Sequence, residues 1–402
     1  MCRWRPYLTG VVLCVLAGAC PWALADGAFI PPEYGTADSA DQRAVIIDQG
    51  ASETLILETA YQGDLSAFAW VVPLPGRIQG ADIGVADQNI FGALESLTAP
   101  RAWLTQGGVV GGCGGCGGGD SDAGGAPGGE NRAGVNVWET LQVAGFEVAI
   151  LSAAQSADLA QWLADNGYAM PPGQQATLQY YVDRGAFFVA IKVAPDQAAA
   201  PAQADGTDHA ALEPLRLTFP KAGGQLVFPL RISQASSKGE TEVRLFVLAD
   251  HRVRSANYPT AQVAANGFDG RQEFAQWYDA RFRQKLRDLG GRAFVVEYAG
   301  PLPEWGVPES LREIIGEREL FVTRLRSYLA PEQMTEDVSL VRAANDAEFN
   351  VDLVVGAALG YRPGVALAAL LLAVVQSRRA LTRRGRNGAR LAALLGIAAM
   401  LL

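Results

Sequence analysis

Apolar side chains near the start of the folded body occur in short runs of strand length. Gly50 lies after the first run and the pair Gly63-Asp64 after the second, where turns are expected. Pro73 follows the third run, and proline ends a central strand because it lacks an amide donor. The pattern therefore predicts three strands, at residues 44–47, 54–57 and 68–72.

More strand candidates continue along the chain. Residues 177–182 and 187–193 have the pattern of a hairpin that turns at Asp183-Arg184-Gly185. The pattern leaves residues 318–329 undecided. The other predicted strands are residues 143–151, 215–219, 226–232, 242–248 and 294–298.

Helical spacing is less frequent than strand spacing. Ser156 is the expected cap of one short helix, and Gly167 is its stop signal. The other predicted helices are residues 89–97, 271–289 and 309–315. Because strands outnumber helices without regular alternation, the sequence predicts a strand-rich α+β fold with a few packed helices.

Two stretches have the composition of flexible connections. Residues 107–134 are dominated by glycine, so little there can pack, and we expect a surface loop. Residues 195–211 are rich in Ala, Asp and Pro, which predicts a loose connection.

Residues 1–25 have the three parts of a secretion signal. Two arginines give a basic start, residues 8–19 are apolar, and residues 23–25 offer small side chains for cleavage. An uncleaved helix is one alternative. A lipoprotein is another, since the residues before Cys20 approach the lipid-attachment pattern.

The C-terminal part is predicted to hold a membrane anchor. Residues 351–377 are the expected transmembrane segment, although Arg362-Pro363 interrupts them. Residues 378–390 contain six arginines and no acidic residue, which the positive-inside rule assigns to the cytoplasm. Residues 391–402 form an apolar tail that is too short to span alone. The main domain, residues 26–345, then lies on the extracytoplasmic side of the cell membrane; the alternative is that both apolar pieces are buried helices of a soluble protein.

Composition and charge permit a folded core and exclude one class of partner. The chain has 402 residues, of which 49% are hydrophobic and 19% charged, a balance that permits a buried core. The formal net charge is -9, so no nucleic-acid partner is expected, because phosphates need clustered lysine or arginine.

Five blocks of sequence follow one another in a distinctive order. They are LILETAYQGDLSAFAWVVPLPG (residues 55–76), FEVAILSAAQSADLAQWLADNGYAMP (146–171), LQYYVDRGAFFVAIKV (178–193), LRLTFP with LVFPLRIS (215–233) and LFVTRLRSYLAPEQMTEDVSL (320–340). Over roughly residues 27–340 the chain resembles the bacterial family catalogued as domain of unknown function 2330. The resemblance implies an exported protein, often with a C-terminal anchor, and it supplies no activity and no functional residues.

Candidate chemistry is sparse. Cys113 and Cys116, the two cysteines after the signal peptide, lie in the glycine-rich stretch. The two cysteines can form a disulfide or remain free thiols, and the sequence does not decide between these states. An even number of cysteines fits an oxidising compartment. One CxxC lacks the four ligands of a zinc site, and a glycine loop lacks the helix that lowers the pKa of a redox thiol. Asp120 and Asp122 are not followed by the other ligands of a calcium loop.

Hydrolase signatures are missing, since the sequence has no GxSxG, HExxH or Walker motif. His251 is the residue left for a Ser-His pair, but it stands beside Arg252 and Arg254, as a polar surface histidine does. One helix carries an aromatic stripe that fits a core better than a ligand groove: Phe274, Trp277, Tyr278 and Phe282. We therefore expect no catalytic, cofactor-binding or metal residue.

The sequence thus predicts a membrane-anchored extracytoplasmic protein with a binding, scaffolding or envelope-related role. Its expected partners are the membrane and a protein or envelope ligand, and no cofactor is expected. An envelope hydrolase with an atypical site is the alternative.

Overall fold

The computed structural model describes residues 28–30, 42–60, 69–105, 134–166, 175–193, 211–237, 239–264, 266–269 and 272–356. The chain divides into two compact units, one of residues 1–101 and 113–353 and one of residues 102–112 and 354–402. Several predicted segments lie outside the described residues: the signal peptide, nearly all of the glycine-rich stretch, most of the connection at 195–211 and the apolar segments beyond residue 356.

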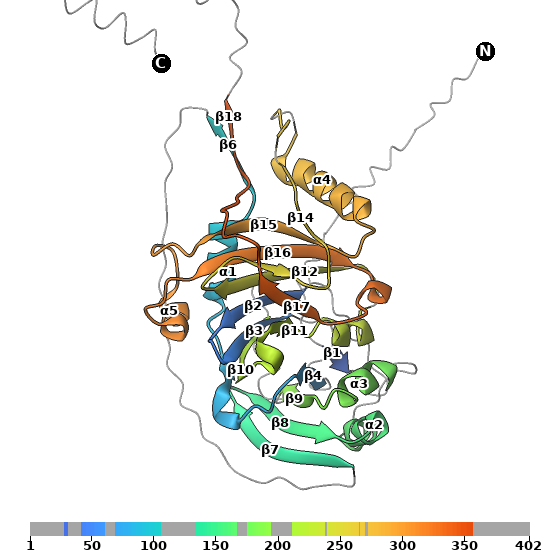
Figure 1. Ribbon diagram of the computed structural model, residues 1–402. Helices are drawn as coiled ribbons and strands as arrows, with labels where there is room; N and C mark the ends of the chain where they lie inside the picture. The colour runs from blue at the N-terminus through green and yellow to red at the C-terminus, as the bar shows by residue number, and fades with distance from the viewer. Residues whose placement is uncertain are drawn as a thin grey trace, which may run out of the picture. The chain divides into compact units, whose positions relative to one another are not determined.

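The larger sheet of the first unit has eight strands in the order β14-β15-β16-β12-β2-β3-β10-β5 (Figure 1). Neighbours are antiparallel except for the parallel pairs β2/β12 and β14/β15. The strands are β2 (Gln42–Asp48), β3 (Ser52–Ala60), β5 (Ile83–Val85), β10 (Ala211–Pro220), β12 (Thr241–Ala249), β14 (Thr260–Gln262), β15 (Phe294–Pro301) and β16 (Phe321–Leu329).

Three smaller sheets complete the strand pairing. An antiparallel five-stranded sheet has the order β1-β4-β9-β8-β7, with β1 (Ala28–Ile30), β4 (Ala69–Leu74), β7 (Val135–Val143), β8 (Phe146–Ala153) and β9 (Phe187–Val193). A three-stranded sheet contains β11 (Leu226–Phe228), β17 (Val338–Arg342) and β13 (Val253–Ser255) in that order. Two strands pair separately: β6 (Arg101–Thr105) and β18 (Asp352–Gly356).

The main apolar core of the first unit contains side chains from the eight-, five- and three-stranded sheets. Ile46, Val72 and Leu340 are one member from each. On β2, Ala44 and Ile46 face this core, whereas Val45 and Ile47 face the opposite side of the sheet. A strand that is buried on both faces is apolar throughout rather than alternating, which explains the continuous run at residues 44–47.

Helices pack on the faces that this core leaves open. On the larger sheet, α1 (Asn89–Thr98) and α5 (Glu309–Ile315) share one apolar cluster with β2, β12 and β16, and α4 (Phe274–Asp288) forms another with β15. On the five-stranded sheet, α2 (Ser156–Asp165) and α3 (Gln175–Val182) pack together against β8 and β9. The α+β prediction and the four predicted helices are thereby confirmed, and residues 318–329 prove to be mostly strand β16.

The predicted hairpin at residues 177–193 is wrong in its first half. Residues 177–182 belong to helix α3, and Leu178, Tyr181 and Val182 are buried on its inner face. Aromatic and β-branched residues favour strands in isolation, but the spacing of these three side chains also suits a helix. Packing on the five-stranded sheet decides between the two.

Three other strand predictions need correction at their ends. The strand expected at residues 68–72 does not end before Pro73, because β4 continues to Leu74 and Pro73 pairs with Phe188 of β9. The strand expected at residues 226–232 stops at Phe228, because Pro229 follows, and Arg231–Ala235 form a 3-10 helix. The strand expected at residues 143–151 is two strands that meet at Ala144 and Gly145, both with positive φ. Positive φ at both central residues is what a two-residue hairpin turn requires.

Among the helices that the structure describes, none combines the length and apolar character needed to cross a bilayer. The predicted span at residues 351–377 begins in strand β18, and its remainder lies outside the described residues.

Candidate ligand site

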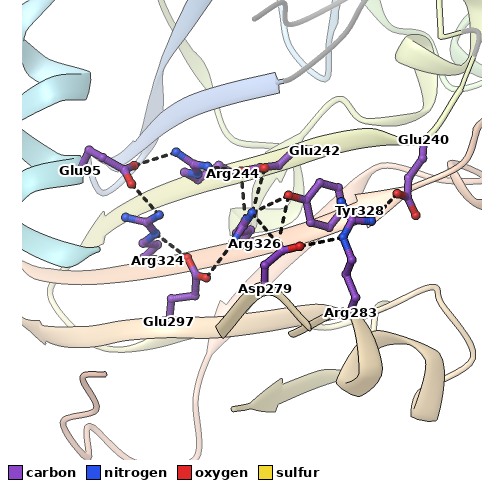
Figure 2. A network of polar contacts seen from close by, with 10 residues as sticks. All are labelled: Glu95, Glu240, Glu242, Arg244, Asp279, Arg283, Glu297, Arg324, Arg326 and Tyr328. Carbon is purple, nitrogen blue, oxygen red and sulfur yellow. Dashed lines mark hydrogen bonds and ion pairs between the residues drawn. The ribbon is translucent and has the colours of Figure 1, made fainter. Parts of the chain in front are cut away.

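A row of charged side chains crosses the helix-covered face of the larger sheet (Figure 2). The strand register places Arg43 opposite Arg244, and Arg244 opposite Arg326. Like charges directly opposite each other destabilise a sheet, so this register needs carboxylates between the arginines.

The carboxylate of Glu58 contacts Arg43. Three other glutamates supply the carboxylates for Arg244 and Arg326. Glu95 of α1 accepts hydrogen bonds from Arg244 at 2.9 Å and from Arg324 at 2.8 Å. Glu242 of β12 contacts Arg244 and accepts two bonds of 3.0 Å from Arg326. Glu297 of β15 accepts from Arg324 at 2.7 Å and from Arg326 at 3.4 Å. Each of these carboxylates therefore bridges two guanidinium groups.

The row continues to α4. Asp279 accepts from Arg283 at 2.9 Å and lies 3.4 Å from Arg326, while Arg283 also bonds Glu240 at 2.6 Å. Tyr328 accepts a bond of 2.5 Å from Arg326. We call the ten residues drawn in Figure 2 the charged network.

The centre of the charged network is buried and electrically paired. Glu297 is 0% exposed and Arg324 is 2% exposed. Burial raises the pKa of Glu242, but Arg326 and Arg244 outweigh it and bring that pKa down to about 2. Since its charges are matched by contacts within the protein, the network is suited to holding α1 and α4 on the sheet rather than to binding a ligand.

A second polar region surrounds a cavity of about 260 Å³. Its apolar wall includes Pro73, Pro75, Phe219 and Pro229, which come from the ends of β4 and β10 and from the residue after β11. Its polar wall includes Tyr180, Tyr181, Arg184, Asp337 and Ser339. A mostly apolar wall with a few converging polar groups is the usual composition of a small-molecule site.

Asp337 is held in the cavity wall by hydrogen bonds to one of its oxygens. The Tyr181 hydroxyl donates to Oδ1 at 2.5 Å, and the Arg231 backbone amide donates to the same oxygen at 3.0 Å. The Tyr181 hydroxyl itself accepts from the Ile232 amide at 2.9 Å. Burial is the main cause that raises the pKa of Asp337 to about 6, against these hydrogen bonds. The same burial, with Asp337 nearby, raises the pKa of the Tyr181 hydroxyl well above its ordinary value.

Two arginines clamp the neighbouring tyrosine. The guanidinium carbon of Arg184 lies 3.6 Å from the centre of the Tyr180 ring, and that of Arg231 lies 4.0 Å from it. Arg184 Nη1 donates to the Tyr180 carbonyl at 3.0 Å, and Arg231 Nη1 donates to the Thr335 carbonyl. Within the described ranges, no carboxylate lies within 4.0 Å of either guanidinium group.

Another buried carboxyl group bonds the cavity wall from β3. Glu53 is fully buried, and its Oε2 accepts from the amide of Val227, a residue that lines the cavity. Its other oxygen, Oε1, is buried without a hydrogen-bond partner. Burial raises the pKa of Glu53 to about 8, so this side chain is largely uncharged at neutral pH.

The residues singled out from the sequence do not gather at this cavity. Cys113, Cys116, Asp120 and Asp122 lie outside the described residues. His251 contacts the adjacent Asp250 carboxylate, and no serine hydroxyl in the described part of the chain bonds to it. No group of three or more His, Cys, Asp or Glu side chains among the described residues is placed to hold a metal ion.

The aromatic stripe of α4 is part of the core, as expected. Trp277, Tyr278 and Phe282 are buried, and Phe274 packs beside them. A ligand groove is therefore not formed by this stripe.

Sequence reasoning misses the residues that the fold brings together. Tyr180 and Arg184 lie in or just after α3, Arg231 begins a 3-10 helix and Asp337 precedes β17, so no local pattern connects them. The charged network leaves one local signal. Arg324 and Arg326, two positions apart among apolar residues, indicate a polar stripe on one face of a strand.

Comparisons with known proteins identify a family but no activity. A family model described as "Uncharacterized protein conserved in bacteria (DUF2330)" matches residues 20–341. No curated protein matches the sequence. Among solved structures, the chain is similar to a mutated baculovirus P35 after caspase cleavage, with 8% identity and a TM-score of 0.32. That match covers 75% of this chain and 99% of the other, and a TM-score this low supports no statement about fold or function.

The family match contains every residue of the cavity wall and of the charged network. Because it also covers most of the sequence, the chain belongs to the bacterial family DUF2330.

Proposed function

We propose that this protein is an exported, membrane-anchored protein whose folded body binds a small ligand. The cavity between α3, β4, β10, β11 and β17 is the observation that carries the proposal. Its volume of about 260 Å³ is close to the lower end of the range for small-molecule sites, roughly 300 Å³. The ligand is therefore small.

The N-terminal and C-terminal segments of the sequence support the proposed cellular location. A basic start, an apolar stretch and a cleavage site at residues 1–25 favour export. The apolar segment at residues 351–377 and the six arginines at residues 378–390 favour an anchor with a cytoplasmic basic flank. The cavity would then face the extracytoplasmic space, where an envelope molecule or a protein partner is available.

Binding fits the cavity better than catalysis does. Nucleophilic catalysis needs a base within hydrogen-bond reach of the nucleophile. The Tyr181 hydroxyl does contact Asp337, but its raised pKa makes it a poor nucleophile at neutral pH. Its contacts instead fix Asp337 in place, as in the wall of a preformed binding site.

A binding test uses the full chain, purified from membranes in detergent. Small envelope-derived molecules are screened by the shift in melting temperature, and a ligand at 100 times its Kd stabilises by about 2.7 kcal/mol. Ala222 lies exposed at the cavity, so Ala222→Trp should fill the cavity and abolish the shift. Ala344→Trp, at an exposed alanine that does not line the cavity, is the matched control and should keep it. Equal shifts in both variants would refute binding at this site.

The proposed location and membrane orientation are tested separately, by cell fractionation and protease accessibility. We expect the body of the protein in the membrane fraction and open to protease from the extracytoplasmic side. Recovery of the whole chain from the cytosol with residues 1–25 still attached would contradict the proposal.

An envelope hydrolase is the second candidate, and the pKa of Asp337 near 6 favours it. A carboxyl group with a pKa close to the working pH suits general acid–base catalysis. Asp337→Asn separates the two functions, because the amide oxygen still accepts from Tyr181 while it cannot transfer a proton. Turnover of a bound envelope molecule that disappears in this variant would establish the hydrolase.

A further inference from the structure

The charge around the cavity is not balanced. Three guanidinium groups lie in or beside its wall, on Arg184, Arg231 and Arg292. They face two carboxyl groups, those of Glu336 and Asp337. Glu336 is paired with Arg292, whereas Asp337 is bonded by a tyrosine hydroxyl and a backbone amide. At least one positive charge is therefore left over, and Arg184 is the arginine of the clamp that lines the cavity.

From this imbalance we infer that the ligand is a small carboxylate, bound through Arg184, with an apolar body against the proline wall. The inference rests on the proposed function, because it assigns the chemistry of the same cavity. A guanidinium fork matches the two oxygens of a carboxylate and binds them with charge-assisted hydrogen bonds.

The clamp prepares Arg184 for such a ligand. The Tyr180 ring and the Tyr180 carbonyl hold the guanidinium group from two sides. Only Nη1 is used in that hydrogen bond, and Nε and Nη2 have no partner among the residues that the structure describes. A preordered side chain with unused donors loses little freedom when it binds, which favours affinity.

The acidic side chains of the wall are less suited to select a cationic ligand. Glu336 is already engaged by Arg292, and Asp337 already accepts two hydrogen bonds on one of its oxygens. Arg184 and Arg231 would also repel a cation at this position. A neutral ligand would leave the guanidinium group of Arg184 without a counter-charge.

A cavity of about 150 Å³ holds benzene, which has six non-hydrogen atoms. In proportion, the cavity of about 260 Å³ limits the ligand to about ten non-hydrogen atoms. Benzoate meets this limit and serves as the probe. Benzamide and benzylamine have nearly the same shape with a neutral and a positive group in place of the carboxylate, so they isolate the effect of charge.

The experiment is a titration of the full chain in detergent with benzoate, benzamide and benzylamine, followed by calorimetry. We expect benzoate to bind at least tenfold more tightly than benzamide, and benzylamine to bind most weakly. Arg184→Gln should lower the benzoate affinity to that of benzamide. Arg184→Lys should retain part of it, because it keeps the charge without the fork. Arg312→Gln, at an exposed arginine of α5, is the matched control and should bind as the wild type does.

The outcomes separate this inference from the proposed function. Equal affinities for benzoate and benzamide, both abolished by Ala222→Trp, would overturn the carboxylate and leave the binding cavity in place. Absence of any binding that Ala222→Trp abolishes, for these probes and for the envelope-derived molecules, would overturn both.

Discussion

The charged network and the cavity wall both contain acidic side chains and arginines, but the pKa values of their buried carboxyl groups shift in opposite directions. In the network, Glu242 lies between Arg244 and Arg326, and its pKa falls to about 2. Beside the cavity, Asp337 and Glu53 lack such partners, and their pKa values rise to about 6 and about 8. The network keeps its carboxylates charged and paired, whereas beside the cavity two buried carboxyl groups have raised pKa values and two guanidinium groups lack a carboxylate within 4.0 Å among the described residues.

This difference separates a structural role from a binding role. Removing one partner of a buried ion pair is strongly destabilising, because it leaves an uncompensated charge. A guanidinium group that has no carboxylate partner in the folded protein costs little stability when it is removed. The two regions should therefore respond in opposite ways to substitution and to pH.

The largest effect is expected at Glu53. Its folded pKa of about 8 exceeds its ordinary value, so its contribution to stability is full below pH 4.5 and is lost as pH rises through 8. In Glu53→Gln this loss disappears, and the variant gains up to about 5 kcal/mol relative to the wild type between pH 4 and pH 9. Urea unfolding across that range measures the gain. Glu242→Gln is the contrasting control, since the contribution of Glu242 is present above pH 4.5 and is lost as pH falls through 2.

Next in size is the loss of Arg324 from the network. Arg324→Met leaves the fully buried Glu297 and the half-buried Glu95 short of a partner, which should cost about 4 kcal/mol of unfolding free energy. The double variant Arg324→Met, Glu297→Met removes both charges and should recover at least half of that loss. Urea unfolding of both variants at pH 7 provides the measurement. A double variant that is less stable than Arg324→Met would contradict this account of the network.

A smaller effect is expected at Asp337. With a folded pKa of about 6, its contribution is full below pH 3.8 and is lost as pH rises through 6. Asp337→Asn keeps the acceptor for Tyr181 and should gain at most about 3 kcal/mol relative to the wild type between pH 3.5 and pH 7.5. A flat difference between the two unfolding curves over this range would show that the carboxyl group is not shifted.

How far the sequence predicts this molecule depends on the distance between the residues involved. Runs such as residues 44–47 identify a doubly buried strand, because burial on both faces leaves a local pattern. The strand predicted at residues 177–182 is wrong because these residues have a strand-like composition but pack on the five-stranded sheet as a helix.

The candidate site is not predictable in the same way. Arg184, Arg231 and Asp337 meet only because α3 and the segments before β17 converge on one tyrosine pair. The arginine row of the network depends on the strand register, which sets Arg244 opposite Arg326. Register and convergence are properties of the whole fold, and neither leaves a mark within one segment of sequence.

The smallest stability effect is the most informative one. The free energy of unfolding of Arg184→Gln, measured by urea denaturation at pH 7 beside Arg324→Met, tests directly whether the cavity arginine is kept for a ligand rather than for the fold. The account predicts a change within about 1 kcal/mol, as for an exposed side chain without a carboxylate partner. A loss as large as that of Arg324→Met would contradict it.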